Sequence, residues 1–292
     1  MSSTDTSIKS ARSLARFPVG QGGLILGGTL VGIILLIALF APVLAPHSPY
    51  AQSLDARMIR PFFMEGGSWN HILGTDALGR DYLSRLLYGA RLSIIVGFGT
   101  VLISAAFGIG LGLLGGYFGG RVDMVVMFVL TIRLSLPIML VAISLVGLLG
   151  NSLFLMMLVL ACFLWDQFLV VTRSLTMRFR NAEFVMAAKA AGVSVPKILF
   201  SEILPNLVSP LVVVATLEMA HAILLEAALS FLGLGIRPPD SSWGLMIAEG
   251  KPYMFFSPWV IAIPGVALMV LVLGINLVGD GLRDLILPDG RN

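Results

Sequence analysis

Five ionisable residues lie inside apolar segments that are long enough to cross a lipid bilayer. They are Arg133, Asp166, Glu218, His221 and Glu226. A charge at the bilayer centre costs about 2.5–3.5 kcal/mol even on insertion scales, so each of these residues needs a partner or water. One interpretation is a polar translocation path that could meet a peptide amino group or a bound cation. The other is internal pairing, for instance of Arg133 with Asp166 or Glu218.

A polar, mildly basic stretch at 181–206 interrupts the apolar segments and has the pattern helix, turn, helix. Ala187 and Ala188 present a small surface that suits close packing. Gly192 favours a conformation that ends a helix, and Pro205 suits the first turn of the next helix, where its missing amide proton costs nothing. Such an elbow can transmit a push from a docked soluble subunit. The alternative is an ordinary turn between two helices.

Other chemistry is not indicated by the sequence. The phosphate-binding pattern G-x-x-x-x-G-K-[ST] does not occur, because Gly250-Lys251 is followed by Pro252. The chain has one cysteine and three scattered histidines, which are His47, His71 and His221. This spacing predicts no metal-ligand cluster. We therefore expect neither an enzyme nor a metal site, and no ATP hydrolysis by the chain itself.

Composition places these residues in a membrane protein. The chain is 57% hydrophobic and 12% charged, with a mean hydropathy of +0.96, which excludes an ordinary soluble domain. The apolar runs are continuous, which predicts helices, so the expected fold is all-α integral membrane. Six of them reach the length of about 20 residues that a transmembrane helix needs. They lie at 22–45, 92–117, 124–149, 152–173, 207–234 and 257–278.

The basic residues predict the orientation of these six transmembrane helices. With the N- and C-termini cytosolic, the cytosolic segments hold most of the lysines and arginines, and 181–206 is cytosolic. The chain then divides into a cytosolic tail (1–20), a first transmembrane helix (21–46), an extracytoplasmic segment (47–90), a five-helix core (91–285) and a cytosolic tail (286–292). The first apolar run is too long for a signal peptide and is interpreted as an uncleaved anchor. The net charge of +3 follows from this bias and does not indicate binding of nucleic acid.

The extracytoplasmic segment is expected to contain an amphipathic helix at the membrane surface. Thr75 and Asp76 can cap it. Its apolar stripe would consist of Leu78, Tyr82 and Leu86. Two ion pairs are expected at i,i+4 spacing, Asp76 with Arg80 and Asp81 with Arg85.

Glycines recur every four residues in the second apolar segment, at Gly108, Gly112, Gly116 and Gly120. A face of small residues lets another helix approach closely inside lipid. The sequence leaves two uses open, which are homodimerisation and packing against the chain's own helices.

Several motifs together resemble the C-type permease subunit of bacterial dipeptide/oligopeptide ABC importers, a group that includes nickel, glutathione and opine relatives. The outer motif reads LGTD at 73–76, GRD at 79–81, LSRL at 83–86 and YGARLS at 88–93. Further matches are LSFLGLG at 229–235 and GDGLRD at 279–284. In the cytosolic loop, the residues that match the family's ATPase-coupling motif are Ala187, Ala188, Gly192, Leu204 and Pro205.

The resemblance implies a type I ABC importer permease fold with a cytosolic coupling helix, in a bacterial cytoplasmic (inner) membrane. It implies a heterodimer with a paralogous B-type permease, two ATP-binding subunits that use ATP and Mg, and an extracytoplasmic solute-binding protein. Contacts with that binding protein would come from 78–86 and 237–243. The solute expected first is a di- or oligopeptide. Nickel chelates, opines and glutathione stay open, because the binding protein usually selects the solute.

Two other functional classes also remain open for this sequence. An ion-coupled secondary transporter would use Glu218, His221 or Glu226 as a proton relay and would need no ATPase. A membrane scaffold would carry no solute and would tolerate a bulky residue at Gly192.

Overall fold

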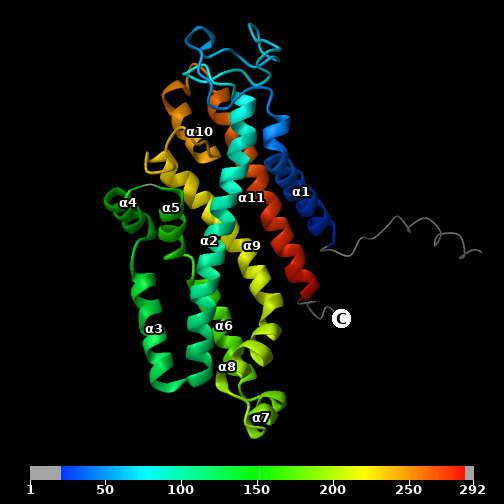
Figure 1. The fold of residues 1–292 in the computed structure, drawn as a ribbon, viewed down its shortest axis with the longest axis vertical. Coiled ribbons are helices and arrows are strands. Elements are labelled where there is room, and N and C mark those ends of the chain that lie inside the picture. Colours follow the sequence, from blue (N-terminus) through cyan, green and yellow to red (C-terminus); the bar gives the residue numbers. More distant parts are fainter. Residues whose placement is uncertain (1–20, 151, 287–292) are drawn as a thin grey trace, which may run out of the picture.

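The computed structural model describes residues 21–150 and 152–286, and within these ranges the regular elements are all helical. Figure 1 shows a long bundle with the loop at 45–81 at one end and α7 at the other. The larger elements are α1 Gln21–Leu44, α2 Tyr82–Phe118, α3 Gly120–Ser135, α4 Ile138–Leu149, α5 Leu153–Ala161, α6 Asp166–Phe179, α7 Glu183–Ala190, α9 Leu204–Phe231, α10 Trp243–Gly250 and α11 Trp259–Ile286. Short helical elements are η1 Leu54–Ala56, α8 Val195–Lys197, η2 Ile198–Ile203 and η3 Lys251–Tyr253.

Four continuous helical segments are long and apolar enough to cross a membrane, and the number reaches the predicted six if each of two bent helix pairs counts as one transmembrane segment. The continuous segments are Gly22–Leu44, Tyr82–Phe118, Val195–Phe231 and Trp259–Ile286. The expectation of continuous third and fourth helices is wrong. Helices α3 and α4 meet at 87°, and α5 and α6 meet at 45°.

Proline accounts for the break between α3 and α4. Pro137 lacks an amide proton and disfavours a helical conformation at the residue before it. Leu136 is accordingly extended, with φ −91° and ψ 126°, and α4 starts directly after Pro137.

The break between α5 and α6 contains no proline, and side chains satisfy two of its carbonyl groups. Trp165 Nε1 donates a hydrogen bond to the carbonyl of Cys162 at 2.9 Å. The Arg133 guanidinium donates to the carbonyl of Phe163. Irregular backbone at membrane depth needs such partners, because lipid offers none. The two side chains therefore stabilise an interruption that composition alone does not reveal.

The predicted amphipathic helix at 75–86 is wrong in its first half. Helix α2 begins at Tyr82, and its N-cap is Asp81, whose side chain accepts a hydrogen bond from the Ser84 amide. Gly79 has φ +72°, a left-handed conformation that interrupts a helix. A Cβ at Gly79 would lie 1.8 Å from the carbonyl oxygen of Ser53, so the turn is also packed too tightly for another residue. The outer segment therefore leads straight into one long helix.

The glycine face of α2 packs inside the chain, which confirms the second of the two predicted uses. A Cβ at Gly108 would lie 2.3 Å from the Trp165 carbonyl oxygen, and one at Gly112 would lie 2.6 Å from Thr172 Cβ. Gly116 approaches the backbone of α6 in the same way, whereas Gly120 faces open space. The small residues thus bring α2 and α6 into direct contact, as close helix packing in lipid requires.

Candidate functional site

The stretch at 181–206 forms a helical hairpin, which we call the end hairpin. Its first arm is α7, and its second arm is α8 with η2, which continues into α9. Figure 1 shows α7 at the extremity of the bundle, at the end opposite to the loop at 45–81. The helix-turn-helix prediction for this stretch is therefore confirmed.

Gly192 closes the first arm in the way the sequence predicts. Its φ is +74°. Its amide donates to the carbonyl of Lys189 at 3.0 Å, and the Val193 amide donates to the carbonyl of Ala188 at 3.0 Å. This paired pattern is the Schellman motif, which ends helices at a left-handed residue. The turn is therefore fixed by backbone geometry.

The end hairpin has one packed face and one free face. Val185, Ile198 and Ile203 are at most 1% exposed and join an apolar cluster with α6 and α9. On the other side, Met186 is 56% exposed, and Ala187 is exposed too. The exposed side of α7 therefore carries apolar residues beside the charged Glu183 and Lys189.

Two basic side chains tie the end hairpin to the end of α2. Lys189 Nζ lies 5.0 Å from the ring centre of Tyr117 and donates to the Arg180 carbonyl at 3.2 Å. Arg180 Nη1 donates to the Gly116 carbonyl at 3.2 Å. These contacts hold α7 against the ends of α2 and α6.

Leu204 and Pro205 open α9, but the helical path begins earlier, at Val195. The π-helix η2 immediately precedes them. Pro205 cannot donate a backbone hydrogen bond, and a local widening of the helix is one way to accommodate that loss. Consequently, the second arm of the hairpin and α9 form one continuous helical segment.

Four of the five ionisable residues singled out within the apolar segments lie close together. Arg133 Nη1 and Asp166 Oδ2 are 2.8 Å apart, which confirms the first of the internal pairings considered. Arg133, Asp166 and His221 are near enough to Glu218 to act on its carboxyl electrostatically. His221 Nδ1 lies 3.5 Å from Glu218 Oε1, and its side chain is 62% exposed. The four residues form a cluster that meets the molecular surface at the imidazole of His221.

Glu226 is separate from that cluster. It is about 12 Å farther along α9 than Glu218, and it is completely buried. Its Oε1 accepts hydrogen bonds from Ser230 Oγ and Ser242 Oγ, both at 2.7 Å. Ser242 is the N-cap of α10, so Glu226 attaches α10 to α9. This packing gives Glu226 a structural role in the conformation described.

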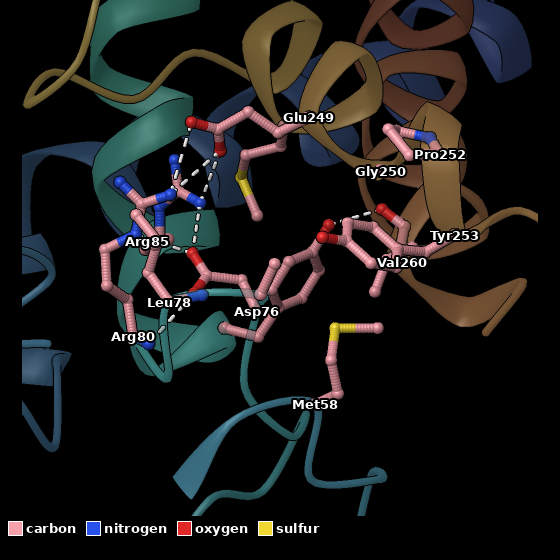
Figure 2. Close-up of a pocket in the computed structure, with 13 residues that line it drawn as sticks. Met58, Asp76, Leu78, Arg80, Arg85, Glu249, Gly250, Pro252, Tyr253 and Val260 are labelled. Carbon is pink, nitrogen blue, oxygen red and sulfur yellow. Dashed lines mark hydrogen bonds and ion pairs between the residues drawn. The ribbon is translucent and has the colours of Figure 1, made fainter. Parts of the chain in front are cut away.

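At the opposite end, a buried charge cluster holds the outer segment against α10. Figure 2 shows Arg80 and Arg85 pointing toward Asp76 and Glu249. These residues line a pocket of about 230 Å³. Arg85 Nη1 lies 2.6 Å from Asp76 Oδ2 and 2.7 Å from Glu249 Oε2, and Arg80 Nε lies 2.6 Å from Asp76 Oδ2. The Asp76–Arg80 prediction is confirmed. The pairing of Arg85 with Asp81 is wrong, because Arg85 turns to Asp76 and to Glu249, which sequence spacing could not connect with it.

Two of the three histidines lie close together in the fold, which corrects the expectation that all three are scattered. His47 and His71 both approach the carboxylate of Asp81, whereas His221 lies on α9. Loop closure, which sequence spacing does not encode, brings these residues together.

Two family models match the chain. The model of the binding-protein-dependent transport system inner membrane component matches residues 108–291. The model of the N-terminal TM domain of oligopeptide transport permease C matches residues 23–61.

Relatives match over most of the chain. The di/tripeptide transport system permease protein of Pseudomonas aeruginosa is 42% identical over 91% of this chain and 88% of its own. The dipeptide transport system permease protein of Escherichia coli K12 is 43% identical over 91% and 89%. The oligopeptide transport system permease protein of Haemophilus influenzae is 38% identical over 79% and 78%.

Proposed function

Because the chain belongs to the binding-protein-dependent transport system inner membrane components, we propose that it forms half of the translocation pathway of an ATP-driven peptide importer. The solute would be a di- or oligopeptide handed over by an extracytoplasmic binding protein. The relatives from Pseudomonas aeruginosa, Escherichia coli and Haemophilus influenzae are di/tripeptide, dipeptide and oligopeptide permeases, which supports this solute class.

The end hairpin is the observation that carries the proposal. It lies at the end of the bundle, its turn is fixed by the Gly192 cap, and it exposes Met186 and Ala187. A separate ATP-binding subunit would hold α7 at this face. Nucleotide-driven closure would then move α7, and the helix that continues from Val195 to Phe231 would carry the displacement into the bundle.

The assembly proposed contains this chain, a paralogous B-type permease, two ATP-binding subunits with ATP and Mg, and the binding protein. The end hairpin and the two tails at 1–20 and 286–292 would be cytosolic. The segment at 47–90 would face the binding protein. The coupling contact is assigned to Ala187, Ala188, Gly192, Leu204 and Pro205.

The resemblance implies that 78–86 contacts the binding protein, but part of this segment is buried. We therefore assign the contact to exposed residues of the outer segment. Tyr82 and Arg85 are at most 2% exposed and engaged in internal contacts. Trp69 is 77% exposed and stacks against Phe62, with ring centres 4.5 Å apart. This aromatic pair offers a rigid apolar surface for a partner.

For the solute path, we propose the cluster around Glu218 and exclude Glu226 in this conformation. Glu218 and Asp166 could interact with the amino group of a peptide, and Arg133 with its carboxylate. Water would reach this cluster beside His221, whose imidazole is exposed.

Uptake by the reconstituted complex tests the proposal. Proteoliposomes with all subunits should accumulate labelled dipeptide only with ATP and binding protein. Gly192→Tyr should weaken docking of the ATP-binding subunits about tenfold or more, which corresponds to about 1.4 kcal/mol, so that they are lost on purification and uptake falls. Gly66→Tyr is the matched control, because Gly66 has φ +80°, open space around it, and a place in the outer segment.

Three outcomes would contradict the proposed mechanism, and a fourth would change only the solute. Uptake without ATP would identify an ion-coupled transporter, and the absence of any flux would identify a scaffold. Equal ATPase co-purification with the Gly192→Tyr and Gly66→Tyr variants would remove the hairpin from the mechanism. Uptake of a nickel chelate or opine in place of the dipeptide would retain the machinery and change the solute.

A further inference from the structure

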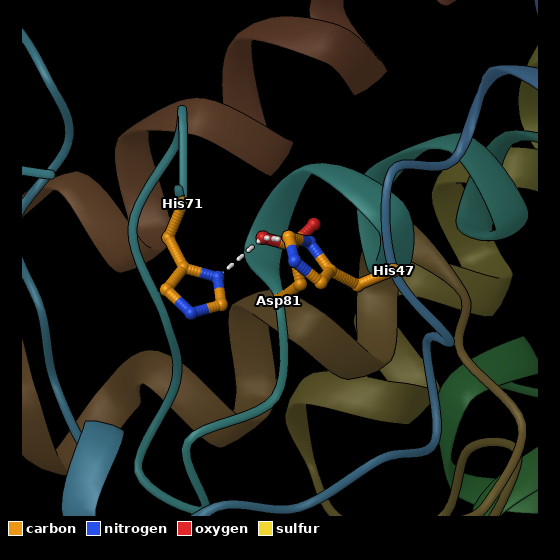
Figure 3. Close-up of side chains that lie close together, drawn as sticks. All are labelled: His47, His71 and Asp81. Carbon is orange, nitrogen blue, oxygen red and sulfur yellow. Dashed lines mark hydrogen bonds and ion pairs between the residues drawn. The ribbon is translucent and has the colours of Figure 1, made fainter. Parts of the chain in front are cut away.

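Two of the chain's three histidines meet at one buried carboxylate on the outer face. His47 follows α1, His71 lies in the outer segment, and Asp81 is the N-cap of α2. His71 Nδ1 is 2.8 Å and His47 Nδ1 is 3.6 Å from Asp81 Oδ1. Figure 3 shows both rings turned toward Asp81. The three potential ligand atoms lie within 4.8 Å of one another.

Asp81 is held in place by the start of α2. Its other oxygen, Oδ2, accepts hydrogen bonds from the Ser84 amide at 2.9 Å and from Ser84 Oγ at 2.7 Å. Ser84 Oγ in turn accepts a hydrogen bond from the His47 amide at 3.2 Å. These contacts fix the carboxylate with Oδ1 directed at the two imidazoles. Outer contacts of this kind orient the ligands of metal sites.

The carboxylate of Asp81 also lacks a permanent positive partner in the described part of the chain. It is 2% exposed. The nearby guanidinium groups of Arg80 and Arg85 pair with Asp76 and Glu249 instead. The ion pairs of Asp81 within 21–150 and 152–286 are with the two histidines only. A buried carboxylate is costly without a compensating charge, which a bound cation would supply.

We propose that His47, His71 and Asp81 form a Zn²⁺ site on the outer face of the molecule. Two imidazole nitrogens and a carboxylate oxygen are ligands that Zn²⁺ prefers. Tetrahedral bonds of about 2.0–2.1 Å place ligand atoms about 3.3 Å apart, between the two observed spacings. The His47 side chain is 43% exposed, so water can provide the fourth ligand.

Binding of Zn²⁺ changes the hydrogen bonding in a defined way. The Nδ1 atoms of both histidines must be unprotonated to bind the ion, and their ring protons then reside on Nε2. The ion replaces the direct contact between His71 and Asp81. It links the end of α1, the outer loop and the start of α2, and so it closes the loop at 47–81. The site does not depend on the proposed transport function.

Zn²⁺ binding to the purified full-length chain in detergent tests the site. We expect one Zn²⁺ per chain in competition with a chromophoric chelator, and tetrahedral absorption bands when Co²⁺ replaces it. His47→Gln and His71→Gln should each weaken binding about tenfold or more. His221→Gln is the matched control, because His221 is also exposed and has its own carboxylate neighbour. This control should bind as the unchanged chain does.

A thermal shift separates metal binding from folding. Zn²⁺ should raise the melting temperature of the unchanged chain and of His221→Gln, because a ligand that binds only the folded state stabilises it. At the same Zn²⁺ concentration the shift should be smaller in His47→Gln, a variant that should still fold because the His47 side chain is partly exposed. Absence of stoichiometric binding in the unchanged chain would overturn the proposal. Equal affinity in His47→Gln and His221→Gln would do so as well.

Discussion

Arg133 on α3 and Asp166 at the start of α6 form an ion pair of 2.8 Å beside the break between α5 and α6. The same guanidinium binds the carbonyl of Phe163 within that break. One side chain therefore neutralises a carboxylate and satisfies backbone that the bilayer would leave without a partner. The unusual arginine in a transmembrane segment has a structural explanation, whichever solute the chain conducts.

The first prediction concerns this pair. Arg133→Gln should lower the free energy of unfolding by about 1–3 kcal/mol, because it leaves Asp166 and the Phe163 carbonyl without their partner. Asp166→Asn should cost less, since the carbonyl contact remains. The double variant should reveal a coupling of about 0.5–3 kcal/mol in thermal melts of the purified protein. Additive effects of the two changes would contradict the pairing, and the exposed Arg237→Gln serves as control.

The contact between α2 and α6 gives a second prediction. Gly112→Leu should destabilise the chain by about 1–3 kcal/mol or more. Its Cβ alone would lie 2.6 Å from Thr172 Cβ. Gly110→Leu, two residues earlier on the same helix, meets open space and should melt as the unchanged chain does. Equal melting temperatures for the two variants would show that α2 and α6 are not packed as described.

The outer charge cluster provides a third prediction. Glu249→Gln removes the carboxylate that accepts from Arg80 and Arg85 and should cost about 1–3 kcal/mol, because two buried guanidinium groups lose a charged partner. Limited proteolysis should then cut the outer segment faster. The exposed Glu65→Gln should stay within about 0.5 kcal/mol of the unchanged chain. Unchanged proteolysis of the Glu249 variant would argue against the cluster as an anchor.

The two buried glutamates of α9 should respond differently to neutralisation. Glu218→Gln should reduce peptide uptake while the complex still assembles, because Glu218 lies beside the exposed His221. Glu226→Gln should lower the melting temperature, because a buried amide would gain unsatisfied donors, and should leave the KM for uptake unchanged. Normal uptake by an assembled Glu218→Gln complex would remove that residue from the proposed path.

The sequence predicts the helical membrane fold and the end hairpin because both depend on local signals. Apolar length identifies each transmembrane segment, and the glycine at position 192 marks a helix end through its own backbone preference. Pro137 is a local signal for the bend between α3 and α4. The second bend has no comparable local mark, because its stability comes from Arg133 on another helix.

The remaining errors come from contacts between distant parts of the chain. Helical spacing predicts that Arg85 pairs with Asp81, but the turn at Gly79 makes the helix begin later, and Glu249 on α10 lies close to Arg85. His47 and His71 meet because the outer loop returns to the start of α2. Such pairings depend on how the loop closes, which residue spacing does not encode.

Site-directed cross-linking of the end hairpin tests the coupling mechanism most directly. In a chain whose only cysteine, Cys162, is replaced by serine, Ala187→Cys should be labelled from the cytosolic side only and should cross-link to the ATP-binding subunit with a yield that changes with nucleotide. Gly66→Cys should be labelled from the opposite side and form no such cross-link. Labelling of Ala187→Cys from outside, or an assembled complex without that cross-link, would contradict the coupling mechanism.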